Sequence, residues 1–350
     1  MFWLTLLAFL IILGLLVFVH EAGHFIAAKL SGVKVEEFAF GFPPRLVCVK
    51  RGETSYCINA IPFGGYVKML GEEKVSDSPR AFNKKRPLLR LVIVVAGVVM
   101  NFILAGVIFS VGYMVGMSPI RVDPAQMGGK QTHQVVIAQI EQGSPAQAAN
   151  LKVGDVVLGY ANIEAFSDFT KSNIGSKVPL SVLREGKITD LSVELSSDQS
   201  APLGVGIVDV PVVKLSFFKS VYFGFKEMFL TTGYIFILLY QFFVKLFSSG
   251  QVTGEVAGPV GIFNITGQAV RMGLSYLLQL AAILSINLGL INILPFPALD
   301  GGRGLFIAIE GIVRRRVMRA EVENMLHFIG FAILILLVAA ITVREVIALF

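Results

Sequence analysis

Long apolar segments dominate the chain and predict several membrane-spanning helices. Four windows without charged side chains are long enough to cross a bilayer, which takes about 20 residues. These windows are residues 1–19, from which the helix is expected to continue to about 30, and residues 91–120, 272–299 and 324–342. A fifth apolar window, 228–244, is shorter and is flanked by Lys226, Glu227 and Lys245. The pattern predicts a polytopic α-helical membrane protein with about four transmembrane helices.

Apolar alternation with a period of two marks two further regions as β structure. Residues 33–70 alternate over three short runs and predict a hairpin that dips into the membrane interface beside the first helix. An extended substrate could add to the edge of such a hairpin, although a hairpin that only braces the helix fits the pattern equally well. Residues from about 125 to 210 carry strand-like runs at 135–140, 179–184 and 190–195 and predict an inserted β-rich domain.

Composition agrees with a membrane protein. Hydrophobic residues make up 55% of the chain and charged residues 15%, whereas soluble domains carry about 25% charge. The net charge of +6 accompanies no nucleic-acid motif, so no nucleic-acid partner is predicted. The two cysteines, Cys48 and Cys57, form no CxxC pair. They are predicted to be reduced packing residues, because the hairpin is expected on the cytoplasmic side.

The distribution of basic residues predicts the orientation in the membrane. Residues 31–90 contain 11 Lys/Arg against 6 Asp/Glu, and a basic run at 314–316 follows the third long window. Residues 120–219, by contrast, hold nearly equal numbers of basic and acidic side chains. The first and last of these segments are therefore expected to face the cytoplasm, and the middle segment the outside.

Candidate chemistry lies inside the first apolar window, at His20-Glu21-Ala22-Gly23-His24. Two imidazoles four residues apart share one face of a helix and suit a zinc ion, while the adjacent carboxylate can serve as a general base. Ionisable side chains at membrane depth are costly and are usually functional. The pattern therefore indicates a zinc site within a membrane segment, with Glu21 as the base.

A third protein ligand leaves zinc with one open position, and Asp300 is the best candidate carboxylate. It ends the third long window in the run Asn292-Ile-Leu-Pro-Phe-Pro-Ala-Leu-Asp-Gly-Gly302. Asp300 must then lie on the same side of the membrane as His20 and His24, so the chain between them crosses twice. Windows 91–120 and 272–299 supply both crossings. Residues 215–247 are therefore predicted to form an interfacial helix on the outer surface.

Several motifs together resemble bacterial site-2 proteases, most closely the regulator of sigma-E protease group. They are "FVHEAGHFIAAKLSGVKVEEFAFGF" at the start, "IPFGGYVKM" at 61–69, "GPVGI" at 258–262 and "NILPFPALDGG" at 292–302. The β-rich insert, with "GSPA" followed by "LKVGDVV", resembles a single circularly permuted PDZ domain. The resemblance covers nearly the whole chain.

This resemblance implies an intramembrane zinc metalloprotease. It assigns His20, His24 and Asp300 as ligands of one zinc ion and Glu21 as the general base. Asn292 would contact the substrate or the developing oxyanion, and Asn101 would line the cleft. The hairpin, with Gly64 and Gly65, would hold the unwound substrate, and Leu203 and Gly204 would form the carboxylate-binding loop of the PDZ-like domain.

The domain order follows from these assignments. The two transmembrane segments that carry the expected ligands are residues 1–30 and 272–302. The remaining segments are the cytoplasmic loop with the hairpin (31–88), the second transmembrane helix (89–118), the extracytoplasmic PDZ-like domain (120–212), the interfacial helix and loop (213–271), a basic cytoplasmic loop (303–322) and the fourth transmembrane helix (323–346). The expected location is the bacterial cytoplasmic (inner) membrane, with the active site towards the cytoplasm.

The expected partners are membrane lipid and single-span membrane proteins, such as a pre-cleaved anti-sigma factor or signal-peptide remnants. Two other interpretations stay open at this point. A membrane-tethered zinc protease could cleave outside the bilayer, with a third ligand from a soluble domain. A non-catalytic PDZ scaffold could instead use zinc as a structural staple closed by a fourth ligand, for which His327 is a candidate.

Overall fold

The computed structural model describes the chain apart from residues 73, 185, 199, 250–256, 316, 317, 319, 349 and 350. Part of the basic run at 314–316 therefore lies outside the described residues. The chain divides into two compact units. One comprises residues 1–2, 107–230 and 265–280, and the other comprises 3–106, 231–264 and 281–350.

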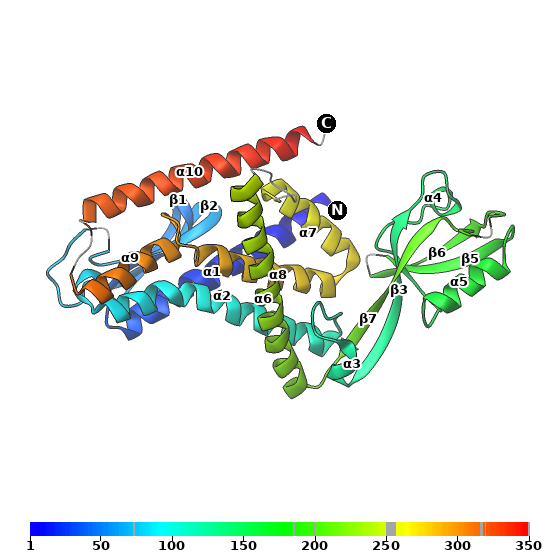
Figure 1. The fold of residues 1–350 in the computed structure, drawn as a ribbon, viewed down its shortest axis with the longest axis horizontal. Coiled ribbons are helices and arrows are strands. Elements are labelled where there is room, and N and C mark those ends of the chain that lie inside the picture. Colours follow the sequence, from blue (N-terminus) through cyan, green and yellow to red (C-terminus); the bar gives the residue numbers. More distant parts are fainter. Residues whose placement is uncertain are drawn as a thin grey trace. The chain divides into compact units, whose positions relative to one another are not determined.

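Figure 1 shows the helices and strands of the described residues. The order is α1 (Phe2–Leu30), β1 (Val35–Arg51), β2 (Thr54–Met69), the short 3-10 helix η1 (Phe82–Lys84), α2 (Pro87–Val115), α3 (Pro124–Met127), β3 (Lys130–Ile140), α4 (Pro145–Ala148), β4 (Val156–Val157), α5 (Ile163–Ser172), β5 (Lys177–Arg184), β6 (Lys187–Glu194), β7 (Val205–Lys214), α6 (Phe217–Ser249), α7 (Pro259–Met272), α8 (Leu274–Asn292), α9 (Asp300–Val313) and α10 (Ala320–Ile347).

Among the described residues, five helices are long and apolar enough to cross a membrane: α1, α2, α6, α8 and α10. Four of them coincide with the long charge-free windows, and α6 contains the shorter fifth window. The chain is thus a helical membrane protein that also contains β-sheet. The segment after Asp300, expected as a basic loop, instead begins with the 14-residue helix α9.

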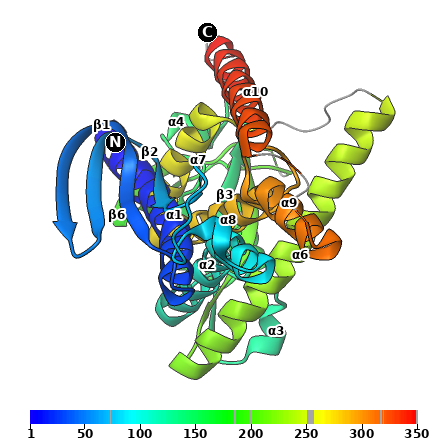
Figure 2. The ribbon, with the colours of Figure 1, turned by 90° about the vertical axis from the view of Figure 1, so that its left-hand side faces the viewer.

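The two long strands after α1 fold back to make a small sheet beside that helix (Figure 2). Residues 37–40 of β1 face residues 65–68 of β2 on one side and residues 55–58 on the other. The sheet packs on α1 through Phe38, whose ring centroid lies 5.8 Å from that of Phe18 and 5.2 Å from that of Phe25. Among the described residues, 65–69 pair only with β1, so they form one free edge of this sheet.

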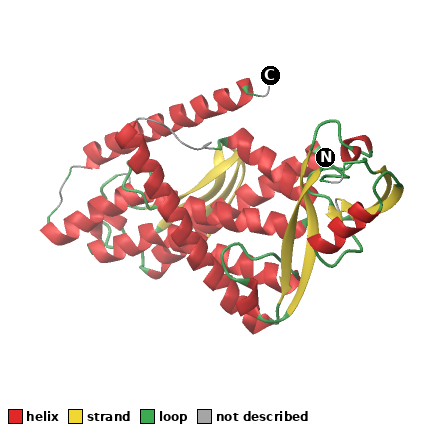
Figure 3. Cartoon of the chain, turned by 45° about the vertical axis from the view of Figure 1, so that its right-hand side comes forward, coloured by secondary structure: helices red, strands yellow, loops and turns green. Residues whose placement is uncertain are grey.

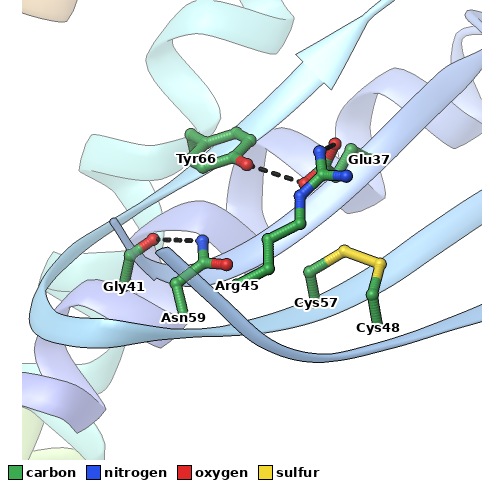
Figure 4. Close-up of a disulfide and its surroundings, with 7 residues drawn as sticks. All are labelled: Glu37, Gly41, Arg45, Cys48, Cys57, Asn59 and Tyr66. Atoms are coloured by element: carbon green, nitrogen blue, oxygen red, sulfur yellow. Dashed lines mark hydrogen bonds and ion pairs between the residues drawn. A yellow bond between two sulfur atoms is a disulfide. The ribbon is translucent and has the colours of Figure 1, made fainter. Parts of the chain in front are cut away.

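A polar cluster stabilises the interior of this sheet (Figure 4). Glu37, almost fully buried, accepts a hydrogen bond of 2.7 Å from the Tyr66 hydroxyl and pairs with the Arg45 guanidinium at 2.7 Å. Burial, together with the bond to Glu37, raises the pKa of the Tyr66 phenol. Asn59 donates to the carbonyl of Gly41 at 2.9 Å. These contacts link the strand segments that the apolar alternation of residues 33–70 predicts to form one hairpin.

The prediction that Cys48 and Cys57 are reduced is wrong in this structure, where the two residues form a disulfide (Figure 4). The register pairs Cys48 directly with Cys57 across the hairpin, and their Cα atoms lie 4.1 Å apart. The alternation shows that both residues lie on strands, but it does not give the register, and only the register brings the two thiols together.

The unit that contains the β-rich insert has a five-stranded sheet in the order β6-β5-β4-β3-β7, and every pair is antiparallel (Figure 3). Its core is formed by alternating aliphatic side chains of the strands together with Phe166 of α5. Asp155, almost fully buried, pairs with Arg184 at 2.6 Å and accepts from the backbone N–H of Lys152 at 2.9 Å. This pair fixes the turn that leads into β4.

In the same unit, Glu227 of α6 is fully buried near the C-terminal end of α2. Its carboxylate accepts hydrogen bonds from the Tyr113 hydroxyl at 2.6 Å and from the backbone N–H of Arg121 at 2.6 Å. It also accepts from the N–H groups of Ile120 and Val122, each at 3.2 Å. The carboxylate therefore fastens the first half of α6 to the segment that follows α2.

We expect Glu227→Ala to destabilise this unit, because it leaves a buried hydroxyl and several backbone N–H groups without an acceptor. Each such loss costs about 1–3 kcal/mol. Tyr113→Phe, which removes one donor, should lower the free energy of unfolding by about 1 kcal/mol. Thermal unfolding of the full chain in detergent measures both, with Phe229→Ala at an exposed position of α6 as the control. Equal stability of Glu227→Ala and the control would contradict the assignment.

Candidate metal centre

Two imidazoles and one carboxylate meet within the unit that contains most of α1. His20 and His24 are buried and lie one turn apart on α1, with their Nε2 atoms 3.2 Å from each other. Oδ2 of Asp300, the first residue of α9, lies 3.0 Å from His20 Nε2 and 3.3 Å from His24 Nε2. Among the described residues, this is the one group of three or more His, Cys, Asp or Glu side chains whose donor atoms converge in this way.

A compact turn brings Asp300 to the imidazoles. The helix α8 ends at Asn292, and a non-helical segment with Pro295 and Pro297 follows, since proline cannot continue the hydrogen-bond ladder of a helix. Ala298 adopts a positive φ of 83° in this turn. Leu299 is then the N-cap of α9, which places Asp300 in the first helical turn.

Ion pairs hold α9 against the rest of its unit. Glu310 of α9 pairs with Arg90 of α2 at 2.6 Å, and both side chains are about nine-tenths buried. Arg303, one turn after Asp300, pairs with Glu72, which lies in the turn after β2. These contacts fix the helix that carries the carboxylate relative to α2 and to the sheet.

The hydrogen bonds behind the two imidazoles decide which ring nitrogens are free. Nδ1 of His24 lies 2.8 Å from the carbonyl oxygen of Ile93, and a carbonyl can only accept, so Nδ1 carries the hydrogen. The Asn101 amide lies 3.2 Å from Nδ1 of His20. Coordination through Nε2 of His20 requires a hydrogen on Nδ1. A 180° turn of the Asn101 amide would bring Oδ1, which has no partner among the described residues, to the position that accepts this hydrogen.

This donor set fits a small divalent cation. Oδ2 of Asp300 is buried and accepts no hydrogen bond among the described residues, although two imidazole nitrogens lie within 3.3 Å. Ligand atoms placed tetrahedrally about 2.0–2.1 Å from zinc are separated by roughly 3.3 Å. Separations of 3.0–3.3 Å between the three donor atoms are close to that value. Two imidazoles and one carboxylate are also a typical ligand set of catalytic zinc.

A side chain would clash at one glycine beside the cluster and would be crowded at another. A Cβ added to Gly97 of α2 would lie 2.4 Å from Nε2 of His24 and 2.9 Å from Cε1 of His20. A Cβ on Gly65 of β2 would lie 3.0 Å from Cγ of Glu21. Gly97 therefore lets α2 approach both imidazoles, and Gly65 brings the free edge of the sheet next to Glu21.

The structure places the other predicted site residues in three different settings. The Asn292 amide lies 3.5 Å from His20 Nε2, at the cluster itself. Asn101 is fully buried behind His20, with its backbone carbonyl accepting from Ser285 at 2.8 Å, and it does not line an open cleft. Gly64 packs against the ring of Phe42 within the sheet.

Leu203 and Gly204, predicted to bind a carboxylate, precede β7 in the other unit. Leu203 belongs to the hydrophobic core of the β-rich domain. The Gly204 N–H donates to the carbonyl of Ala201 at 3.0 Å, and the Gly204 carbonyl accepts from Glu141 at 3.0 Å. The backbone at Gly204 is therefore already hydrogen-bonded within the domain.

His327, the candidate for a fourth ligand, lies on α10 and faces the turn before Asp300. Its Nδ1 accepts a hydrogen bond from the backbone N–H of Ala298 at 2.9 Å. It does not belong to the converging group of metal-ligand atoms. Among the described residues, three candidate ligands converge, and His327 does not close the set with a fourth.

Sequence reasoning missed Gly97, the carbonyl of Ile93 and the role of His327. Residues 96–102, "AGVVMNF", contain a usable signal for Gly97, because Gly97 and Asn101 lie four residues apart and so share one face of α2. A backbone carbonyl has no sequence signal. His327 lies 27 residues after Asp300, and only the packing of α10 brings the two regions together.

Comparison with known proteins finds similar chains that are named zinc metalloproteases. A protein of Clostridium acetobutylicum that carries the name of a zinc metalloprotease is 36% identical over 95% of both chains. A similarly named protein of Fusobacterium nucleatum is 33% identical over 99% of this chain and all of its own. Zinc metalloprotease RasP of Oceanobacillus iheyensis is 29% identical over 99% of both chains. Residues 8–337 match the model of peptidase family M50, and the chain therefore belongs to this family and is a membrane zinc metalloprotease.

Proposed function

We propose that this protein is an intramembrane endopeptidase whose zinc ion is held by His20, His24 and Asp300. The observation that carries the proposal is the approach of Asp300 Oδ2 to both Nε2 atoms, at 3.0 and 3.3 Å. The two imidazoles belong to a helix with the length and hydropathy of a membrane span. Peptide hydrolysis at this depth would act on transmembrane segments or on residues next to them.

Each residue of the cluster has a distinct part in the reaction. When bound, zinc would polarise the scissile carbonyl and lower the pKa of the attacking water to about 7. Glu21, which interacts electrostatically with both imidazoles and with Asp300, takes the proton of that water and passes it to the leaving nitrogen. The Asn292 amide, next to His20 Nε2, donates to the oxygen that gains charge.

The free edge of the sheet supports a way to present the substrate. Residues 65–69 of β2 pair with β1 on one side only, and Gly65 lies against Glu21. A substrate segment that has lost its helical structure can pair with this edge and satisfy its backbone groups in an apolar environment. Its scissile bond would then pass the catalytic carboxylate, with Gly64 and Gly65 beside it.

The meeting of His20, His24 and Asp300 also supports a topology with four transmembrane helices. His20, His24 and Asp300 can meet only if the chain between them crosses the membrane an even number of times. The helices α2 and α8 supply two crossings, and α7, with 14 residues, is too short for another. In its own unit, the second half of α6 runs across α2 and α8 and not alongside them (Figures 1 and 2). These features support an interfacial α6.

Basic residues support the orientation within a bacterial cytoplasmic membrane. The excess of Lys and Arg in residues 31–90 places the sheet and the catalytic end of α1 towards the cytoplasm. The β-rich domain would then lie outside as a single PDZ-like module, with the loop at Leu203 and Gly204 next to its edge strand β7. Suitable substrates would be single-span membrane proteins, such as an anti-sigma factor that has already been cleaved outside the membrane, or signal-peptide remnants.

The rival proposal, a scaffold with structural zinc, has less support. A structural zinc site is usually closed by four protein ligands. The nearest spare imidazole, that of His327, uses Nδ1 to accept the Ala298 N–H. Three ligands with an open position favour hydrolysis over a purely structural role.

Glu21→Gln tests the catalytic role directly. The variant should keep its zinc, because no ligand changes, while cleavage of a single-span model substrate in detergent should fall by about 10²–10⁴-fold. Zinc analysis of the purified protein and peptide mapping of the products measure the two effects. Cleavage at the wild-type rate would remove the mechanism, and a cut far outside the apolar segment would favour a tethered protease.

Gly97→Ala tests the geometry of the metal centre. The added methyl would overlap His24 Nε2 and should displace the imidazoles, so that zinc binds at least about 10-fold more weakly. The matched control is Gly233→Ala in α6, where a Cβ would meet no atom within 4 Å. Competition with a chelator measures the affinity of both variants. Equal affinities would show that α2 does not approach the imidazoles in this way.

A further inference from the structure

Helix α10 contacts the rest of its unit at few places. Only 6% of its apolar window is buried. Gly330 is the one residue of α10 classed as buried among those the structure describes. A Cβ on Gly330 would lie 2.3 Å from the carbonyl oxygen of Pro297, so the backbone of the helix packs directly on the turn before Asp300.

His327 lies one helical turn before Gly330 on α10. It contacts Ala298, which follows Pro297 in the loop before Asp300. Its Nδ1 accepts the N–H of Ala298 at 2.9 Å. The ring of Phe306, on α9, meets the imidazole edge to face with 6.4 Å between centroids. The imidazole is therefore held between the turn and the helix that carries Asp300.

Ala298 needs such support. Its φ of 83° is unfavourable for a residue with a Cβ, and conformations of this kind persist only where the surroundings enforce them. The hydrogen bond to His327 provides an acceptor for the Ala298 N–H and so stabilises the turn two residues before Asp300.

We propose that His327 and Gly330 are positioning residues for the zinc ligand Asp300. They fix the Pro297–Ala298 backbone from α10, and this backbone sets where the carboxylate of Asp300 points. The inference rests on the zinc site proposed above. It gives α10 a function in the metal centre although none of its residues is a ligand.

The role requires an acceptor at the Nδ1 position and no positive charge. A neutral imidazole with its hydrogen on Nε2 meets this requirement. Asparagine carries its Oδ1 at the corresponding place on the side chain, whereas leucine has similar bulk and no acceptor. The two substitutions therefore separate the hydrogen bond from the packing.

The test compares His327→Asn with His327→Leu in the full-length protein in detergent. His327→Leu should weaken zinc binding about 10–100-fold, the usual effect of removing a group that orients a ligand. His327→Asn should recover most of that affinity. Competition with a zinc chelator gives the affinity, and thermal unfolding of the metal-free protein reports on general damage to the fold.

Gly330→Ala provides an independent test, because it should stabilise the helix itself while it disturbs the contact with Pro297. Alanine favours helix over glycine, but its methyl would push the Pro297 carbonyl away. We therefore expect weaker zinc binding and a lower kcat without a loss of helical structure. Leu336→Ala, at an exposed position of the same helix, is the matched control and should behave as the wild type.

The outcomes distinguish this inference from the zinc site itself. Zinc binding by the wild type that is lost in Asp300→Ala, together with unchanged affinity in His327→Leu and Gly330→Ala, would overturn the positioning role alone. A wild type that binds no zinc would overturn the proposed site. Equal losses in His327→Asn and His327→Leu would show that the hydrogen bond is not what matters and would also reject the inference.

Discussion

The approach of one carboxylate to two imidazoles is the constraint on which the rest of this structure depends. Asp300 Oδ2 lies within 3.3 Å of Nε2 of both His20 and His24. The groups come from helices separated by most of the chain, and in an apolar environment they would be costly without a shared cation. In the unit that contains this cluster, many tertiary contacts serve to keep these three atoms together.

Most of those contacts are made by backbone groups and small residues. The Ile93 carbonyl fixes the tautomer of His24, and Gly97 lets α2 come close enough to do so. On the other side of the cluster, Gly330 lets α10 reach the turn before Asp300. Helices in a membrane gain little from apolar contact with one another and associate instead through close packing and hydrogen bonds. Small residues at these positions serve both purposes.

Several buried carboxylates among the described residues have charged or hydrogen-bonding partners. Glu310 is matched by Arg90 between α9 and α2, and Glu37 by Arg45 and Tyr66 within the sheet. In the other unit, Glu227 is surrounded by donors from the end of α2 and the segment after it. A buried carboxylate without such partners would cost several kcal/mol. Pairing of this kind makes the helix contacts specific where apolar packing alone would not.

The sequence by itself determined the membrane class, the positions of the long helices and the pair His20 and His24 on one helix face. These follow from local periodicity and composition, which need no knowledge of packing. It also indicated Asp300 as a third ligand, because a zinc site with an open position needs one. The tertiary structure decided everything that depends on register or on distant segments: the Cys48–Cys57 disulfide, the burial of Asn101 behind His20, and the contact of His327 with Ala298. A periodic pattern shows which way a side chain faces along its own element, but the neighbour it meets is set by how that element packs.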